Sequence, residues 1–217
     1  AKKFIVGLLT TIDSPLLTFI ISSILEQKLT DIVVICDSKK IKDKDRKIWQ
    51  ERTGGVFDRI VDVKAMMIPF YFVNSHNDED TLNLIDFLSI DVLLNAGTPR
   101  KIKKHIIEST KHGVVNVHPG VLPYYRGCSV VEWAIFNDDK IGNTAHFMTE
   151  GYDDGNIIFC ESYKFQSNAD YKSIRVKVYR EGIIMAGKAL RLIFDKRITS
   201  SDITPQDHNL AKYWKPI

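Results

Sequence analysis

The stretch of sequence that decides the fold is residues 91–117, DVLLNAGTPRKIKKHIIESTKHGVVNV. Its apolar runs at 91–95 and 113–117 favour β-strands, and the segment 99–110 between them favours a helix. A connection of this length joins parallel strands of one sheet and packs its helix on that sheet. The unit therefore predicts an α/β fold.

The same alternation fills the chain before this unit. Strand patterns precede helix patterns three times, with strands expected at 3–9, 31–36 and 70–74 and helices at 16–27, 39–52 and 78–88. Repeated β-α units predict a Rossmann-like, mostly parallel sheet with helices on both faces. Ligands of such sheets bind beyond the carboxyl ends of the strands.

After residue 117 the pattern changes to two strands around a loop, followed by one long helix. We expect the strands at 142–149 and 156–165 and the helix at 172–195. These elements complete one domain, residues 1–200, and leave 201–217 as a C-terminal tail.

Composition narrows the class of protein. The 217 residues carry a net charge of +3 from 30 basic and 27 acidic side chains, too balanced for a nucleic-acid surface, so we expect no nucleic-acid partner. No apolar segment reaches the ~18 residues of a membrane span, so no membrane partner is expected either. The lysine-rich segment 39–52 is interleaved with acids and is interpreted as an exposed helix face. Cys36, Cys128 and Cys160 lie too far apart for a disulfide framework or a zinc site, which favours a cytoplasmic location and no bound metal.

Two polar residues end the last strand of the β-α series. Asn116 and His118 lie two positions apart, so their side chains share one face of the strand at its carboxyl end. An amide can donate a hydrogen bond to a developing oxyanion, and an imidazole can donate one or move a proton near neutral pH. The pair suits acyl transfer, but Asn-x-His also occurs at purely structural strand ends, so the residue types alone do not decide.

The loop at 150–156 supplies acids for the imidazole. A carboxylate that faces an imidazole fixes its orientation and raises its basicity. Asp153 and Asp154 are equally suited on this ground, and Asp-Asp-Gly is also an ordinary turn sequence. The choice between the two acids stays open at this level.

Two linked motifs resemble the signature of the 10-formyltetrahydrofolate-dependent formyltransferases. They are Asn116-x-His118 with its proline- and glycine-containing loop to Gly127, and Asp153-x-Gly155 before an apolar strand, with 35 positions from His118 to Asp153. The resemblance implies 10-formyltetrahydrofolate as co-substrate. It also implies that Asn116 donates to the formyl oxygen, that His118 moves a proton and stabilises the tetrahedral intermediate, and that Asp153 orients His118 and helps to remove the amine's proton.

The segment 94–100 resembles the strand end and loop that bracket the pteridine ring in the same family. By this resemblance the pteridine contacts backbone around Arg100, Ile102, Gly151 and Tyr152. His146 matches a histidine that recurs in the family, with a buried structural role as the alternative.

Three amine acceptors compete within the family: glycinamide ribonucleotide, the methionyl group on initiator tRNA, and a nucleotide-linked amino sugar. The nearly balanced charge disfavours tRNA, and the loop after the first strand lacks the glycine-rich form that cradles a phosphate, which disfavours glycinamide ribonucleotide. Residues 122–127 and the tail at 206–215 resemble features of sugar N-formyltransferases, and this resemblance implies a nucleotide-linked 4-amino-4,6-dideoxy sugar, the kind used in bacterial surface polysaccharide. Expected substrate contacts, where aromatic rings can stack on the base or cover a sugar face, are Tyr124, Tyr125, Arg126 and Trp214.

Two hypotheses outside transfer are kept. A hydrolase would give the formyl group to water with the same three residues, and a catalytically silent module would only bind folate or nucleotide. Analysis of the products formed with candidate amines separates these hypotheses. A homodimer is a candidate assembly that the sequence leaves open.

Overall fold

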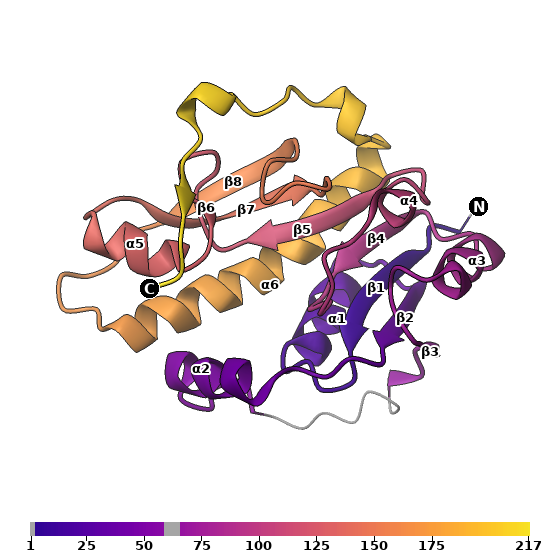
Figure 1. Ribbon diagram of the computed structural model, residues 1–217, viewed down its shortest axis with the longest axis horizontal. Coiled ribbons are helices and arrows are strands. Elements are labelled where there is room, and N and C mark those ends of the chain that lie inside the picture. Colours follow the sequence, from indigo (N-terminus) through magenta and orange to yellow (C-terminus); the bar gives the residue numbers. More distant parts are fainter. Residues whose placement is uncertain (1–2, 59–65) are drawn as a thin grey trace.

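The structure is a computed structural model that describes residues 3–58 and 66–217. Its centre is a seven-stranded sheet of order β3-β2-β1-β4-β5-β7-β8 (Figure 1). The strands of this sheet are β1 (Val6–Thr11), β2 (Ile32–Asp37), β3 (Phe70–Val73), β4 (Val92–Asn95), β5 (Val114–His118), β7 (Ile141–Phe147) and β8 (Ile157–Tyr163). Strands β1 to β5 are mutually parallel, and β7 runs antiparallel to both of its neighbours. The predicted Rossmann-like, mostly parallel sheet is confirmed.

Helices cover both faces of the sheet. They are α1 (Leu17–Glu26), α2 (Asp43–Thr53), α3 (Glu79–Phe87), α4 (Lys104–Ile107), α5 (Val130–Phe136) and α6 (Tyr171–Lys196). Leu94 packs in one apolar cluster with residues of α1 and α6, while its neighbour Leu93 packs on the other face with Ile85 of α3 and Ile106 of α4. Successive side chains of a strand point to opposite faces, so both faces of β4 are buried. This explains why the central strands are continuous apolar runs.

The helix expected at 99–110 is shorter than predicted, because α4 covers only Lys104–Ile107. The loop before it is bonded to the side chain of Asn77, which accepts from the amide of Lys103 at 2.8 Å and donates to the carbonyl of Lys101 at 3.0 Å. These bonds replace those that a helix would make within itself. The prediction was wrong for 99–103, because the competing partner is remote in the sequence, and also for 108–110, where the chain turns after α4.

One helix and one small sheet were not predicted. Helix α5 follows the motif loop, and the loop itself holds β6 (Arg126–Gly127), which pairs in parallel with β9 (Tyr213–Trp214) of the tail. Figure 1 shows the tail, in yellow, passing over the sheet and descending beside β6. A two-residue pairing between segments 87 positions apart leaves no local pattern. The boundary expected between 200 and 201 stays a prediction, and a 3-10 turn, η2 (Ser200–Asp202), spans it.

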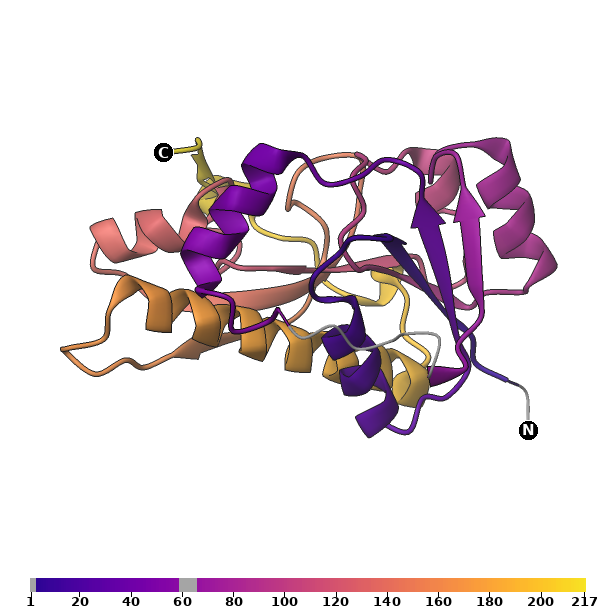
Figure 2. The ribbon, with the colours of Figure 1, turned by 90° about the horizontal axis from the view of Figure 1, so that it is seen from below.

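The charged segment 39–52 contains α2, which ends at Gly54 in a left-handed cap with φ of 57°. Most of its side chains are exposed, as expected. One side of α2 nevertheless packs against α6 (Figure 2). Across the part of the chain that the structure describes, no helix combines the length and apolarity needed to cross a bilayer. The same residues offer no group of three metal-ligating side chains close enough to hold an ion.

Candidate active site

The three residues expected to react meet at the carboxyl edge of β5. Asn116 and His118 lie on β5, and Asp153 lies in the loop between β7 and β8. Nδ1 of His118 is 3.2 Å from Oδ1 of Asp153. Asp154 instead accepts a hydrogen bond from the hydroxyl of Thr149. The geometry therefore favours Asp153 where the residue types left the two acids tied.

Each ring nitrogen of the buried His118 faces an oxygen atom. Nε2 donates to the backbone carbonyl of Tyr125 at 2.6 Å, and Nδ1 faces Asp153. A proton must lie between Nδ1 and the carboxylate, because two lone pairs at this distance would repel each other. Burial lowers the pKa of His118, and the charge of Asp153 and the bond to Tyr125 oppose this shift.

Asp153 is held by contacts from two other segments. Its Oδ2 accepts from the amide of Gly127 at 2.9 Å, and its backbone carbonyl accepts from the side chain of Gln206 in the tail at 3.0 Å. Gln206 in turn accepts from the buried guanidinium of Arg126 at 2.7 Å. The φ of Asp153 is +54°, a conformation that costs a non-glycine residue roughly 1 kcal/mol. The loop and the tail thus hold a strained residue at the site.

Strand pairing places Asn116 opposite His146 of β7. Nδ2 of Asn116 lies 3.2 Å from Nε2 of His146, whose Nδ1 donates to the carbonyl of Phe147 at 2.9 Å. Burial lowers the pKa of His146 to about 4, so the ring is neutral at pH 7 and Nε2 carries a lone pair. His146 is buried, as the structural interpretation expects, and it also contacts Asn116, while its match to a histidine of the family stays a prediction.

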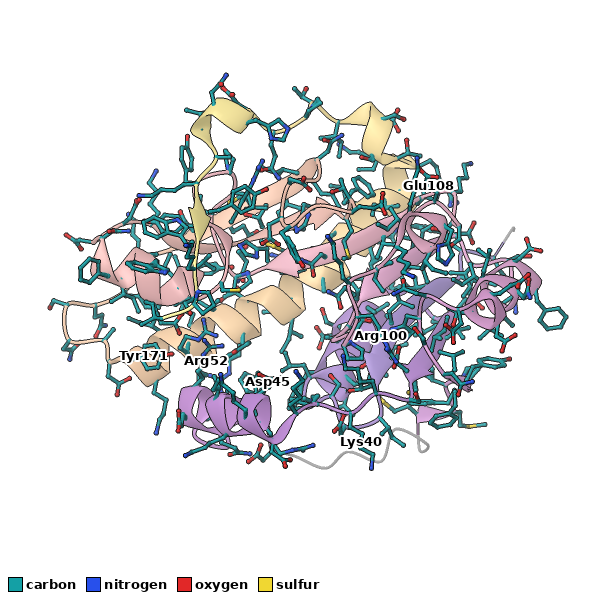
Figure 3. All side chains as sticks on the ribbon, in the orientation of Figure 1. Lys40, Asp45, Arg52, Arg100, Glu108 and Tyr171 are labelled. Carbon is teal, nitrogen blue, oxygen red and sulfur yellow. The ribbon has the colours of Figure 1, made fainter. Side chains whose placement is uncertain are left out.

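A cavity of about 450 Å³ opens beside Asn116. Its walls come from the loops after β1 and β4 and from α2 and α6, and they include Asp13, Asp45, Arg46, Trp49, Gln50, Asn95, Thr98, Asn116, Pro119 and Tyr179. The rings of Trp49 and Tyr179 meet edge to face with centroids 4.6 Å apart. Figure 3 labels one of these wall residues, Asp45 of α2, and also labels Arg100, which belongs to the loop after β4.

The loops expected to bracket the pteridine lie next to each other. Nζ of Lys101 is 4.6 Å from the centre of the Tyr152 ring, which joins the loop after β4 to the exposed loop containing Gly151. The side chain of Arg100 points away, toward Asp37, with two bonds of 2.9 Å each. The side chain of Ile102 is buried in the core. The side chains of Arg100 and Ile102 are thus engaged within the protein, so a ligand at this loop would meet their backbone groups. Folate binding at Arg100, Ile102, Gly151 and Tyr152 stays a prediction.

The four residues expected to contact the acceptor form a packed cluster with the tail. Tyr125 stacks on Trp214 with centroids 5.3 Å apart, and the indole of Trp214 donates to the carbonyl of Tyr124 at 3.0 Å. Arg126 is fully buried and bonded to Gln206. None of the four lines the 450 Å³ cavity. In the structure these four residues hold the loop and the tail together, and a contact with substrate stays a prediction.

Sequence analysis missed Trp49 and Tyr179 of the cavity wall, and it included Asn95 only as part of the segment 94–100. Trp49 lies in the segment interpreted as an exposed helix face, where a single tryptophan among charged residues was the available signal. Asn95 ends β4 as Asn116 nearly ends β5, so a polar residue after an apolar strand was the signal there. Tyr179 lies within the long α6 and carries no local signal.

An amide donor beside an imidazole–carboxylate pair, at the carboxyl edge of a mostly parallel sheet, is the class of site that acyl transfer requires. The formyl transferase family model matches residues 9–186, and the chain belongs to this family. Members of the family use 10-formyltetrahydrofolate as the formyl donor. The adjacent loops around Lys101 and Tyr152 and the amide of Asn116 fit such a donor.

Similar proteins differ in the acceptor that their names give. The methionyl-tRNA formyltransferase of Alkaliphilus oremlandii (strain OhILAs) is 29% identical over 150 residues, which cover 69% of this chain and 47% of that protein. The chain spans about half the length of the curated relatives it matches. Glycinamide ribonucleotide transformylase 1 from Symbiobacterium toebii has a TM-score of 0.69 at 18% identity, over 94% of this chain and 93% of that one. A sugar N-formyltransferase from Shewanella sp FDAARGOS_354 has a TM-score of 0.65 at 16% identity, over 98% and 77%. Both structures show the fold alone.

Proposed function

We propose that this protein transfers a formyl group from 10-formyltetrahydrofolate to the amino group of a nucleotide-linked amino sugar, such as a dTDP-4-amino-4,6-dideoxy sugar, for surface polysaccharide. The observation that carries this proposal is the cavity of about 450 Å³, which has Asn116 at one side and the rings of Trp49 and Tyr179 at another. Aromatic rings suit a flat base or the apolar face of a sugar.

The residues at the carboxyl edge of β5 divide the reaction among them. As the amine nitrogen bonds to the formyl carbon, the carbonyl oxygen gains negative charge, and the Nδ2–H of Asn116 stabilises it. The amine's proton goes to the Asp153 carboxylate of the His118–Asp153 pair. When the bond between the formyl carbon and the folate nitrogen breaks, the pair returns one proton to that nitrogen. The pair therefore ends each cycle with the proton it began with.

The loop after β1 disfavours a phosphate monoester at this position of the cavity. In this loop Asp13 accepts from the hydroxyl of Thr11 at 2.8 Å and from the amide of Ile41 at 3.3 Å, and it pairs with Arg46 at 2.8 Å. The carboxylate of Asp13 thus occupies the hydrogen-bond donors of this loop, which a phosphate monoester bound there would need. An added phosphate would meet this negative charge at close range, which costs binding energy.

The test is a panel of acceptors incubated with 10-formyltetrahydrofolate, with mass spectrometry detecting one added formyl group. The panel contains nucleotide-linked amino sugars, glycinamide ribonucleotide and methionyl-tRNA, and free formate is measured in parallel. Formylated sugar nucleotide supports the proposal. Formylation of only another acceptor, release of formate alone, or no product would overturn it.

Variants tie the acceptor to the cavity. Trp49→Ala should raise the KM for the sugar nucleotide roughly tenfold, as expected for the loss of one stacking contact of about 1–3 kcal/mol, and should leave the KM for folate unchanged. Phe87→Ala is the matched control, because Phe87 is an exposed aromatic on α3 that does not line the cavity. An unchanged acceptor KM in Trp49→Ala would remove the cavity from the proposal.

A further inference from the structure

A continuous line of hydrogen bonds runs from the loop after β4 to the ring of His146. It begins at Asn95, the last residue of β4. Oδ1 of Asn95 accepts from the amides of Gly97 at 3.1 Å and Thr98 at 3.0 Å. Because two backbone N–H groups can meet only the oxygen of the side-chain amide, the orientation of Asn95 is fixed.

The nitrogen of Asn95 then fixes the next amide. Its Nδ2 donates to Oδ1 of Asn116 at 3.0 Å, since β4 and β5 are adjacent strands. The far end of the line requires the same direction. Nδ1 of His146 donates to the carbonyl of Phe147, which leaves Nε2 of His146 as an acceptor for Nδ2 of Asn116.

One N–H of Asn116 is left over for the cavity that this residue lines. An amide nitrogen carries two hydrogens, and His146 takes only one of them. If the amide of Asn116 were reversed, a carbonyl oxygen would face the reacting carbonyl and would repel the developing oxyanion. The direction of the hydrogen-bond line therefore decides whether Asn116 helps or hinders the reaction.

We infer that Asn95 is a positioning residue that holds the side-chain amide of Asn116 with its N–H toward the reacting carbonyl. The inference rests on the proposed formyl transfer, and it gives Asn95, which also lines the cavity, the role of orienting a second residue. Both lone pairs of the Asn95 carbonyl are used by the loop, and its nitrogen donates to Asn116, so its role lies in orientation.

The sharpest test is Asn95→Asp compared with Asn95→Ala. The carboxylate of Asn95→Asp still accepts from Gly97 and Thr98, but it has no hydrogen to donate, so the amide of Asn116 must reverse. Turnover should then fall toward that of Asn116→Ala, on the order of a hundredfold to a thousandfold, with the KM for folate little changed. Asn95→Ala loses the loop bonds, but His146 still orients Asn116, so turnover should fall only about threefold. A merely structural role predicts the opposite order, with Asn95→Ala the more damaging, and that order would overturn the inference.

The second readout is the titration of His146 by NMR. In Asn95→Asp the reversed Asn116 presents its oxygen to Nε2 of His146, which must take up a proton, so the pKa of His146 should rise from about 4. The other charged and titratable groups that face His146 are His118, Asp153 and Asp154, and they are the same in every variant. An unchanged pKa in Asn95→Asp would overturn the inference.

The new charge needs its own control. If reversal of the Asn116 amide causes the rise in the pKa of His146, Asn95→Asp should not raise that pKa in an Asn116→Ala background. A rise that persists there would come from charge alone and would overturn the inference. Asn83→Asp, on the exposed side of α3, is the matched control for an added carboxylate and should change neither readout.

The wild-type protein provides a measurement that does not depend on folding of a variant. At neutral pH His146 should carry its proton on Nδ1 and none on Nε2, which nitrogen chemical shifts distinguish. A proton on Nε2 would reverse the line and overturn the inference. Because this measurement needs no substrate, it tests the direction of the hydrogen-bond line even where the acceptor panel refutes the proposed function.

Discussion

Two neighbouring acids, Asp153 and Asp154, differ in their partners, and Asp153 is the one whose carboxylate faces His118. Asp153→Asn keeps the shape of the side chain but removes the charge that orients His118, so turnover should collapse, while Asp154→Asn should lose little because its partner is Thr149. The carboxylate of Asp153 raises the pKa of His118, and its removal lets that pKa fall. A low-pH limb of activity that reports His118 should therefore move to lower pH in Asp153→Asn.

Purified variants compared at saturating folate test this choice, with thermal unfolding as the control for fold. Near-normal turnover in Asp153→Asn together with an inactive Asp154→Asn would place the acid one residue later.

A buried neutral histidine makes stability depend on pH. The pKa of His146 is about 4 in the folded protein against 6.5 for the free side chain, so the unfolded chain binds a proton first. Its contribution is fully present above pH 6.5 and is lost as the pH falls toward 4. The loss amounts to about 3 kcal/mol.

The measurement is urea unfolding between pH 7 and pH 4 of the wild type and of His146→Gln. The wild type should lose more free energy of unfolding over this range, because the variant has no group to titrate at this position. Parallel pH profiles for the two proteins would show that His146 is not the group responsible.

At the scale of elements, the short pairing of β6 with β9 depends on Gly127. Its φ is +96°, and an added Cβ would lie 2.5 Å from the carbonyl oxygen of Trp214. Gly127→Ala should therefore destabilise the protein and separate the two strands. Gly113 also has a positive φ, +68°, but its Cβ would meet only ordinary contacts at 3.8 Å.

Comparison of the two glycines separates the clash from the backbone strain. Gly113→Ala should cost roughly 1–2 kcal/mol from the strain alone, and Gly127→Ala should cost more. Gly127→Ala should also lower turnover, because the amide of Gly127 holds Asp153 at 2.9 Å. Equal losses of stability in thermal unfolding would count against the importance of the β6–β9 contact.

Local sequence patterns predicted the helices and strands whose apolar periodicity is strong. They failed where contacts with residues remote in the sequence determine the structure. The β-α units and the long α6 follow from apolar spacing. The proximity of His118 and Asp153 agrees with two motifs, one on β5 and one in the loop between β7 and β8, while the catalytic roles of Asn116, His118 and Asp153 stay predictions. The shortened α4 depends on Asn77, a residue from another loop. The cavity wall at Trp49 and Tyr179 depends on how α2 packs against α6, and no segment of the sequence contains that information alone.

At the scale of the whole molecule, the tail and the loop that carries Asp153 form one unit. The side chain of Gln206 donates to the carbonyls of Asp153 and Gly155 and accepts from the buried Arg126. Gln206→Leu should leave these groups without a partner and cost about 2–3 kcal/mol of stability. Turnover should fall more than folate affinity, because the Asp153 loop loosens.

Gln166→Leu is the matched control for this variant, since Gln166 is exposed. Stability by urea unfolding and turnover at saturating folate should be unchanged in the control. Normal turnover in Gln206→Leu would show that the loop keeps Asp153 in place without the tail.

The pairing of β6 with β9 also affects how the protein folds during its synthesis on the ribosome. Proteins emerge from the ribosome from the amino end, and domains begin to fold as they emerge. Strands β1 to β8 precede residue 164, so the central sheet can assemble while Gln206 and β9 are still within the exit tunnel. During that interval Gly127 lacks its strand partner and the strained Asp153 lacks the Gln206 contact. A nascent chain would thus hold a formed sheet while the loop that carries Asp153 still lacks its contacts with residues 206–214.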